Sequence, residues 1–247
     1  MTQNNEGSQP SPNHSIAVIN EDREDLVNDE EMPSLGFRYY GQFQPQVDRF
    51  IHERYFMNRK NPGVLIECGA FDGVMESSCK FFEETLGWTA YNIEPSPKIF
   101  EALCRNRPNS TNINLALDSR VGEALFSDCI LPGYELCTNG SLRHLEKHRE
   151  WLDTMNCQYS QSVVKTTTFQ NLLEQFPLNH IDLMVLDVEG NELEVLSGFE
   201  GAMAFPRILC VEHGHLGIPA VCEAANRLGY KFDTASHVNS FFIWQGK

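Results

Sequence analysis

Acidic residues follow the ends of five apolar runs in this chain of 247 residues. Each run has the composition of a strand buried on both faces of a parallel sheet, and in such sheets the carboxyl ends of the strands share the edge where ligands bind. The acids are Glu67, Asp72, Glu94, Asp118, Asp187 and Glu212. Buried carboxylates are costly unless they are paired. The pattern therefore predicts a ligand with several hydroxyl groups and a positive charge at this edge.

The stretch from 64 to 73 has the pattern of a strand, a glycine turn and the approach to a helix. It contains Glu67, Gly69, Asp72 and Gly73. Glycine lets the backbone turn tightly and approach a ligand, because no Cβ stands in the way. The sequence contains neither the G-x-G-x-x-G fingerprint nor a P-loop. Acids stand where a phosphate would bind, so the turn favours a nucleoside ligand without phosphate.

Glu94 follows the second apolar run and is succeeded by Pro95. In nucleotide-binding α/β folds the acid at this position accepts hydrogen bonds from the hydroxyl groups of a ribose. The sequence therefore predicts that Glu94 binds a ribose.

Strand and helix patterns alternate from residue 64 onwards, which indicates a doubly wound α/β fold with a parallel sheet and right-handed crossovers. Strands are expected at 64–68, 89–93, 112–117, 163–167, 181–186, 208–211, 230–232 and 241–244. Helices are expected at 46–57, 76–86, 97–106, 141–154, 169–176, 192–196 and 219–228. The short link between the last two strands predicts that they pair antiparallel.

The segment 119–165 interrupts this alternation and is interpreted as a variable insertion. It contains one expected edge strand, 123–126, and a helix, 141–154, that carries the densest basic patch of the chain. A solvated helix face is the favoured interpretation of that patch, and contact with an anionic substrate group is the alternative. Residues 37–57 and 131–160 are expected to shape the pocket of the substrate.

The formal net charge is −15, which argues against a general nucleic-acid-binding protein. Residues 1–33 are polar and acidic, and they are expected to form a disordered tail ahead of a single domain at 34–247. No apolar run approaches the ~20 residues that cross a bilayer, and no secretory signal is seen. The eight cysteines form no C-x-x-C pair, which favours reduced thiols in a cytoplasmic protein and argues against zinc.

Together these motifs resemble the FkbM family of S-adenosylmethionine-dependent methyltransferases. The resemblance covers residues 62–213, most of the expected domain. It rests on E-x-G-A-x-x-G from Glu67 to Gly73, on Glu94-Pro95, on the helix that Thr168 precedes, and on the run Ile181 to Gly198 with its Asp-Val-Glu-Gly motif.

The resemblance implies a Rossmann-like class I methyltransferase sheet of seven strands, with the last strand antiparallel. It implies methyl transfer from S-adenosylmethionine to a hydroxyl group, often on a sugar or a polyketide, and a sugar or glycan is the acceptor expected here. By the same resemblance Glu67, Gly69 and Gly73 line the methionine part of the cofactor, Glu94 holds the ribose and Asp118 lies near the adenine. Asp72 and Pro95, which belong to the same motifs, are further candidate cofactor-binding residues.

Methyl transfer to an alcohol requires an aligned nucleophile and a base that removes its proton. Asp187, Glu189 and His213 follow adjacent strands and are the candidate catalytic residues. His213 is the first choice of base, because its unperturbed pKa is about 6.5, and a hydrogen-bonded structural histidine is the alternative. Glu189 and Glu192 have the alternative role of accepting backbone N–H groups where the next helix begins.

Three other interpretations stay open. A divalent metal held by Asp187, Glu212 and His213 is not favoured over the metal-free mechanism. A catalytically inactive methyltransferase-like binding module and, least favoured, a nucleotide-dependent oxidoreductase are the other function classes. A cofactor-binding assay distinguishes these function classes. The sequence identifies neither the methyl acceptor nor the oligomeric state.

Overall fold

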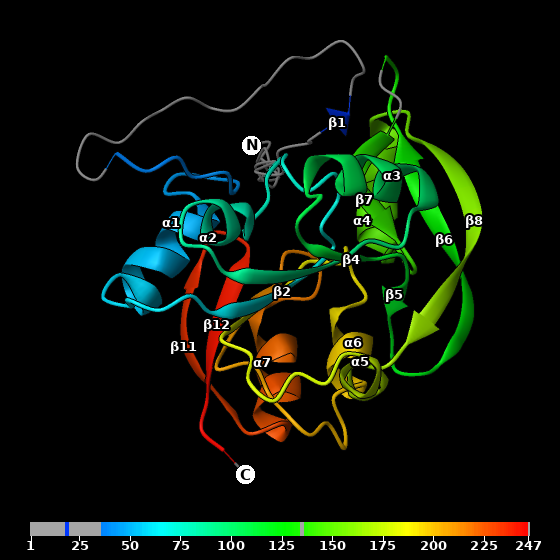
Figure 1. The fold of residues 1–247 in the computed structure, drawn as a ribbon. Helices are drawn as coiled ribbons and strands as arrows, with labels where there is room; N and C mark the ends of the chain where they lie inside the picture. The colour runs from blue at the N-terminus through cyan, green and yellow to red at the C-terminus, as the bar shows by residue number, and fades with distance from the viewer. Residues whose placement is uncertain (1–17, 20–35, 134–135, 247) are drawn as a thin grey trace, which may run out of the picture.

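The computed structural model describes residues 18–19, 36–133 and 136–246, which form two β-sheets with helices packed on the larger one (Figure 1). The predicted tail, residues 1–33, lies outside the described residues except for Val18–Ile19. None of the described helices is long and apolar enough to span a membrane.

The larger sheet has seven strands in the order β11-β12-β10-β9-β2-β3-β4. They are β2 (Val64–Cys68), β3 (Thr89–Ile93), β4 (Thr111–Ile113), β9 (Leu183–Leu186), β10 (Ile208–Glu212), β11 (Tyr230–Ser236) and β12 (Asn239–Trp244). Strands β2, β3, β4, β9 and β10 are parallel, whereas β12 is antiparallel to both β10 and β11. The predicted seven-stranded sheet with an antiparallel last strand is thus confirmed. Strand β9 is the middle strand and β2 lies beside it, and between these two the strand order reverses, which is where ligands bind in such folds.

Helices cover both faces of this sheet. Neighbouring strand residues alternate between the faces, so Ile66 packs in one apolar cluster and Leu65 in the other. The first cluster includes residues of α5 (Phe169–Gln175), α6 (Glu192–Ser197) and α7 (Ile218–Arg227). The second includes residues of α1 (Val47–Ile51), the π-helix η1 (His52–Phe56) and α2 (Lys80–Glu84). Burial on both faces explains why the strands appear in the sequence as continuous apolar runs.

Several helices differ at their ends from the sequence prediction. Helix α2 begins at Lys80 rather than near residue 76, because Glu76 has a φ of +55° that no helix accommodates. The helix expected at 46–57 is observed as α1 followed directly by η1. Helix α3 (Pro97–Asn106) has the predicted bounds. Thr168 caps α5 as predicted, since its hydroxyl oxygen accepts the N–H of Asn171 at 3.1 Å.

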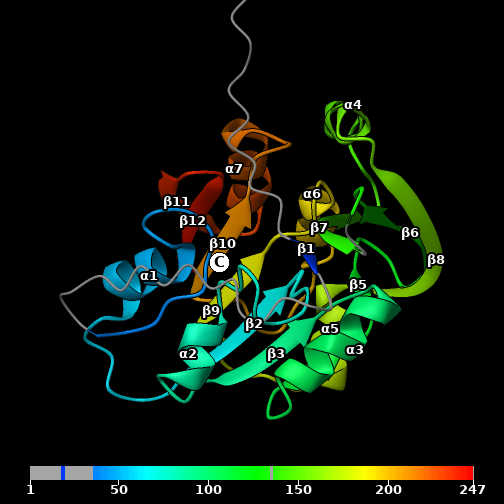
Figure 2. The ribbon, with the colours of Figure 1, turned by 90° about the horizontal axis from the view of Figure 1, so that it is seen from above.

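The smaller sheet has the order β1-β7-β6-β8-β5. Its strands are β1 (Val18–Ile19), β5 (Ala116–Leu117), β6 (Gly122–Ile130), β7 (Leu136–Ser141) and β8 (Gln158–Thr167), with helix α4 (Glu146–Thr154) between β7 and β8. Strands β6 and β8 pair over nine positions and form a long curved wall beside the larger sheet (Figures 1 and 2).

Three strand predictions are corrected by this second sheet. The strand expected at 112–117 is divided, because β4 pairs with β3 whereas β5 pairs with β8. The strand expected at 163–167 is the end of β8, and the edge strand expected at 123–126 is part of the longer β6. Each of these two strands leaves several side chains exposed on one face. Charged residues at exposed positions, such as Glu123 and Lys165, interrupt the continuous apolar pattern on which the prediction relied, although Leu125 and Val163 are exposed as well.

Candidate functional site

The carboxyl ends of β2, β3, β9 and β10 border a cavity of about 1300 Å³, counted with the part that is open to solvent. Residues of the loop before α1 and of β7 also line it. Six carboxylic acids lie in the cavity wall, and among the described residues of that wall none is Lys, Arg or His. These acids are Glu67, Glu76, Glu94, Asp187, Glu189 and Glu212. Gly69 and Pro95, two further predicted site residues, lie in the same wall.

Two glycines let the chain close around the cavity. Gly69 has a φ of +85°, and a Cβ there would lie 1.7 Å from the carbonyl oxygen of Asp187. Gly73 has a φ of +78°, and a Cβ there would lie 2.6 Å from the side chains of both Leu103 and Arg107. Both positions therefore require glycine for chain packing, independently of any ligand.

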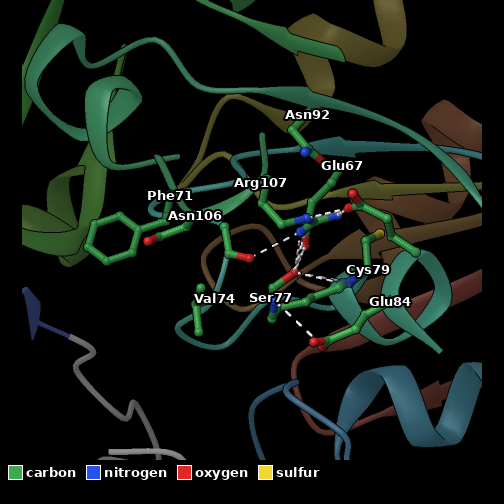
Figure 3. Close-up of polar contacts among 12 residues, drawn as sticks. Glu67, Phe71, Val74, Ser77, Cys79, Glu84, Asn92, Asn106 and Arg107 are labelled. Atoms are coloured by element: carbon green, nitrogen blue, oxygen red, sulfur yellow. Dashed lines mark hydrogen bonds and ion pairs between the residues drawn. The ribbon is translucent and has the colours of Figure 1, made fainter. Parts of the chain in front are cut away.

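Glu67 is held in a buried polar network that Figure 3 shows. The Ser77 hydroxyl lies 2.9 and 3.0 Å from its two carboxylate oxygens, and Nη1 of Arg107 lies 3.5 Å from Oε2. Arg107 also pairs with Glu83 and donates to the carbonyl of Gly73 at 3.1 Å. Burial raises the pKa of Glu67, and the Arg107 charge opposes that rise. The network fixes the glycine loop against α3.

Glu94 is buried at the end of β3, and each of its carboxylate oxygens accepts one backbone N–H. Oε2 accepts from Phe71 at 3.0 Å and Oε1 accepts from Ser96 at 2.8 Å. A carboxylate offers about four acceptor positions, so these two contacts leave room for one more donor on each oxygen. Burial raises the pKa of Glu94 to about 8, although both N–H groups lower it.

Three carboxylates gather where β9 and β10 end. One oxygen of each of Asp187, Glu192 and Glu212 lies within 4.8 Å of the others. The Glu192 carboxylate accepts the N–H groups of Val188 and Gly190 at 3.0 to 3.2 Å. These contacts match the alternative role of Glu192, which is to hold the backbone where the next helix begins. Oε2 of Glu212 is buried without a hydrogen-bond partner among the described residues. Burial, with the neighbouring acids, raises the pKa of Asp187 and of Glu212 well above the usual range.

Glu189 lies in the cavity wall between residues of three other elements. Its Oε2 is 2.9 Å from Nε2 of His215, which follows β10, and 3.8 Å from Nε2 of His148 on α4. Its Oε1 accepts from Nδ2 of Asn139 on β7 at 3.3 Å. The two imidazole rings stack with centroids 3.7 Å apart and planes 10° apart. Burial raises the pKa of Glu189 to about 8.

Four predicted site residues are not among the described residues that line the cavity: Asp72, Gly73, Asp118 and His213. Asp72 accepts two backbone N–H groups of its own loop at 2.8 and 2.9 Å. Asp118 follows β5 and accepts the N–H of the next residue at 2.8 Å. Nδ1 of His213 lies 2.9 Å from the hydroxyl of Ser240, a contact that matches the structural alternative for this histidine.

Backbone strain is concentrated in the cavity wall. Four of its residues have a positive φ although they are not glycine. They are Phe43 (+74°), Phe71 (+49°), Glu76 (+55°) and Glu189 (+57°). Such conformations are uncommon, and they persist where the surrounding structure holds them, often at functional sites. The strain therefore supports the cavity as the functional site.

The free energy of unfolding is expected to fall as the pH rises from about 4.5 to about 8. Glu94 and Glu189 have a pKa of about 8 in the folded chain against an ordinary value of 4.5. The folded chain therefore keeps protons that the unfolded chain has lost, and the stability they give disappears as the pH passes about 8. Melting temperatures measured across this range at fixed ionic strength check the slope. Glu94→Gln should flatten it, and Glu101→Gln on the exposed side of α3 should not.

The family of the chain follows from its match to a family model. The model described as the Methyltransferase FkbM domain matches residues 67–241, more than half of the chain. The chain belongs to the FkbM methyltransferase family. A comparison with curated proteins found no match.

Solved structures that resemble this FkbM chain have low sequence identity to it. Methyltransferase FkbM from Methylobacillus flagellatus KT has 13% identity and a TM-score of 0.48, with 80% of this chain and 50% of that one covered. This FkbM chain thus spans half the length of that protein. Aeropyrum pernix fibrillarin in complex with S-adenosyl-L-methionine has 9% identity and a TM-score of 0.45, covering 79% and 71%. Precorrin-6y C5,15-methyltransferase from Geobacter metallireducens GS-15 has 10% identity and a TM-score of 0.44, covering 89% and 96%.

The sequence motifs of this FkbM chain did not point to the residues that hold its acids in place. Arg107 lies 40 positions beyond Glu67 at the end of α3 and carries no motif. His148 lies on α4, within the segment 119–165, where the sequence prediction treated the basic residues of the helix as solvated. Only His215 had a signal, its place two residues after His213, and that spacing alone did not connect it to Glu189.

Proposed function

We propose that this FkbM chain is an S-adenosylmethionine-dependent O-methyltransferase for an uncharged hydroxyl compound, with a sugar or glycan as the first candidate. One observation carries the proposal. Six carboxylic acids and, among the described wall residues, no cationic side chain line a cavity at the ligand-binding edge of the sheet. A cofactor with a ribose and a positive charge offers the hydroxyl groups and the charge that such a wall pairs with.

The residues of the wall fit this cofactor. Glu94 would hold the ribose, because each of its oxygens has room for one more donor. Asp187 and Glu212 would face the cationic groups, which favour their ionised forms. Ile93 and Leu117 give the wall an apolar part that suits an adenine ring. When bound, the cofactor supplies an electrophilic methyl group on a sulfonium centre.

The other predicted cofactor residues act through the loops they hold. Glu67 and Asp72 fix the glycine loop by the contacts described above, and Gly69 lets that loop pass close to β9. Pro95 lies in the wall beside the proposed ribose site. Asp118 near the adenine stays a proposal that rests on the family resemblance alone.

A sugar acceptor is supported by aromatic and planar polar side chains in another part of the wall. Phe43 lines the cavity, and its ring stacks on His237 with centroids 4.6 Å apart. Nε2 of Gln42 donates to Glu76 at 3.1 Å, and Asn239 also lines the cavity. An aromatic face with amide and carboxylate groups beside it suits a ring that has apolar C–H faces and a rim of hydroxyl groups.

Glu189 is the best supported base among the three predicted catalytic residues. It lines the cavity, and its pKa of about 8 lies near the usual operating pH of an enzyme. Asp187 lies in the same wall and is proposed to face the reacting groups. His213 is supported less, because it is not among the described wall residues and bonds to Ser240 instead.

The metal-assisted alternative stays a lesser proposal. Asp187 and Glu212 do lie together, but the third ligand atom within 4.8 Å comes from Glu192 and not from His213. A cytoplasmic location, a tail at 1–33 and a domain at 34–247 with an insertion at 119–165 also stand as proposals from the sequence.

Calorimetric titration with S-adenosylhomocysteine, beside NADH, tests the proposed function. We expect micromolar binding of S-adenosylhomocysteine and no binding of NADH, because the wall favours a ligand without phosphate. Binding of NADH alone would support the oxidoreductase alternative. Binding of neither ligand would support the inactive binding module.

The same titration of Glu94→Gln tests the ribose assignment. Measured above about pH 8, where Glu94 is ionised, affinity should fall about 10- to 100-fold, because a hydrogen bond to a charged group contributes about 1.5–3 kcal/mol and the amide offers one acceptor oxygen instead of two. Glu101→Gln on the exposed side of α3 is the matched control. Wild-type affinity in the Glu94 variant would remove Glu94 from the ribose site.

A further inference from the structure

We propose that His215 is the positioning residue for Glu189 during proton removal from the acceptor, and that His148, stacked on His215, holds it in place. The inference rests on the proposed function, because Glu189 is the base of the same site. It adds two histidines to that site, one of them from the insertion.

The contacts join elements that are far apart in the chain. Glu189 follows β9, His215 follows β10, and His148 lies on α4 of the smaller sheet. Nε2 of His215 is 2.9 Å from Oε2 of Glu189, and Nε2 of His148 is 3.8 Å from the same oxygen. Asn139 donates to the other oxygen at 3.3 Å. With both oxygens held from different sides, the carboxylate has one fixed orientation.

Burial places the histidines behind Glu189 and away from the acceptor. Glu189 lines the cavity, whereas His148 and His215 are not among its described wall residues. Their side chains are 1% and 9% exposed. An acceptor in the cavity therefore meets Glu189, and the histidines act through it.

The backbone of Glu189 is strained in a way that this support explains. Its φ of +57° is costly for a residue with a side chain. Glu192 fixes the loop around it by accepting the N–H groups of Val188 and Gly190. The strained conformation thus carries the Glu189 carboxylate from the end of β9 to His215 and Asn139.

Charged and titratable groups face this cluster from several elements. Those near Glu189 or His215 are Glu76, Cys137, His144, Asp187, Glu192 and Glu212. Burial lowers the pKa of His215 although the charge of Glu192 raises it, and the lowered pKa favours the neutral ring, which carries one N–H. Placed on Nε2, that N–H donates to Glu189 and stabilises its carboxylate among the neighbouring acids.

The ring geometry distinguishes this support from a metal site built on the same three residues. A metal ion lies in the plane of each imidazole that binds it, about 2.0–2.1 Å from the nitrogen. The two rings here are nearly parallel, with centroids 3.7 Å apart. One ligand atom of each of the three residues lies within 4.8 Å of the others, but stacked rings direct their nitrogen lone pairs along nearly parallel planes, so in this conformation the lone pairs do not converge on one ion.

Long-range ¹H–¹⁵N spectra of the histidine rings test the contact in the full-length protein without any acceptor. Glu189→Gln should shift the ring signals of His215, because its hydrogen-bond partner changes. The signals of His180, whose side chain is 66% exposed and pairs with Asp182, should stay in place. Unchanged His215 signals would overturn the proposal.

Kinetics test the positioning role. His215→Ala should lower kcat about 10- to 100-fold, below the full contribution of a base, while KM for the acceptor and S-adenosylhomocysteine affinity stay within about twofold. His215→Gln, whose amide N–H can donate to Glu189, should restore part of kcat. His148→Phe keeps a stacked ring and should retain more kcat than His148→Ala. His180→Gln is the matched control.

Two kinetic results would overturn the proposal. One is an unchanged kcat in His215→Ala. The other is a loss of cofactor affinity in this variant as large as its loss of kcat, which would indicate a purely structural role. A failure of the proposed function itself would give a result different from these two kinetic results. In that case the wild-type protein would bind no S-adenosylhomocysteine, while the ring spectra would still show whether His215 bonds to Glu189.

Discussion

Replacing Glu189 by Gln is expected to lower methyl transfer by about 100- to 10,000-fold, the range that a positioned general base contributes. The amide has nearly the size of the carboxylate but does not take up the proton of the acceptor. Affinity for S-adenosylhomocysteine should change little, because other acids of the wall face the proposed cofactor. Transfer of a radiolabelled methyl group to an acceptor from a glycan panel measures the loss.

His213→Ala separates the two candidate bases. We expect this variant to keep most of its turnover, since the His213 ring bonds to Ser240 and is not among the described wall residues. The reverse result, an active Glu189→Gln and an inactive His213→Ala, would restore His213 as the base. Melting temperatures of both variants show whether a lost activity reflects lost folding.

Gly69→Ala is expected to prevent stable folding. The new Cβ would lie 1.7 Å from the carbonyl oxygen of Asp187, a distance that forces β2 and the loop after β9 apart. That loop carries Asp187 and Glu189, so the site would be displaced together with the sheet. Domains have only about 5–15 kcal/mol of net stability, and a clash between this Cβ and a main-chain carbonyl at the edge of β2 and β9 removes a large part of it.

Gly133→Ala is the matched control for this prediction. Gly133 has the same φ of +85°, but a Cβ there would have nothing within 4 Å. Its substitution should cost only about 1–2 kcal/mol of conformational strain. Urea unfolding gives the free energy of unfolding of the two variants. The loss in Gly133→Ala reports the conformational strain, and the additional loss in Gly69→Ala reports the steric clash. Equal stabilities would mean that the close approach at Gly69 is relieved by movement of the loops.

The larger sheet was predictable from the sequence because its strands are buried on both faces. Runs such as Val64–Cys68 and Ile208–Glu212 have neighbouring residues in opposite apolar clusters, so nearly every position is apolar. The acids at the ends of these strands were predictable for the same reason, because an acidic residue that ends a run of apolar residues is easily recognised in the sequence. Glu67, Glu94 and Asp187 do lie in one cavity wall.

The partners of these acids were not predictable, because they come from distant elements through contacts that leave no periodic pattern. Arg107 reaches Glu67 from the end of α3, and His148 reaches Glu189 from a helix of the smaller sheet. Strand β8 begins with five residues that are mostly polar. The sequence pattern therefore predicted neither the full length of this strand nor the second sheet. Local sequence identifies the acids, whereas tertiary packing decides which groups hold them.

Strand β5 has a consequence for how acceptor specificity is exchanged between relatives. Its two residues pair with Thr166 and Thr167 of β8 directly after β4, and the N–H of Asp118 donates to the carbonyl of Thr167 at 2.9 Å. A chimaera with junctions at 119 and 165 would leave this pairing in the host but would divide β8 after Lys165, so that Gly122 of the grafted β6 would have to pair with Thr166 of the host. A graft that spans Ala116 to Thr167 would carry both partners, together with His148 and Asn139. Recombination of acceptor specificity in this fold should therefore succeed with the longer block and fail with the shorter one.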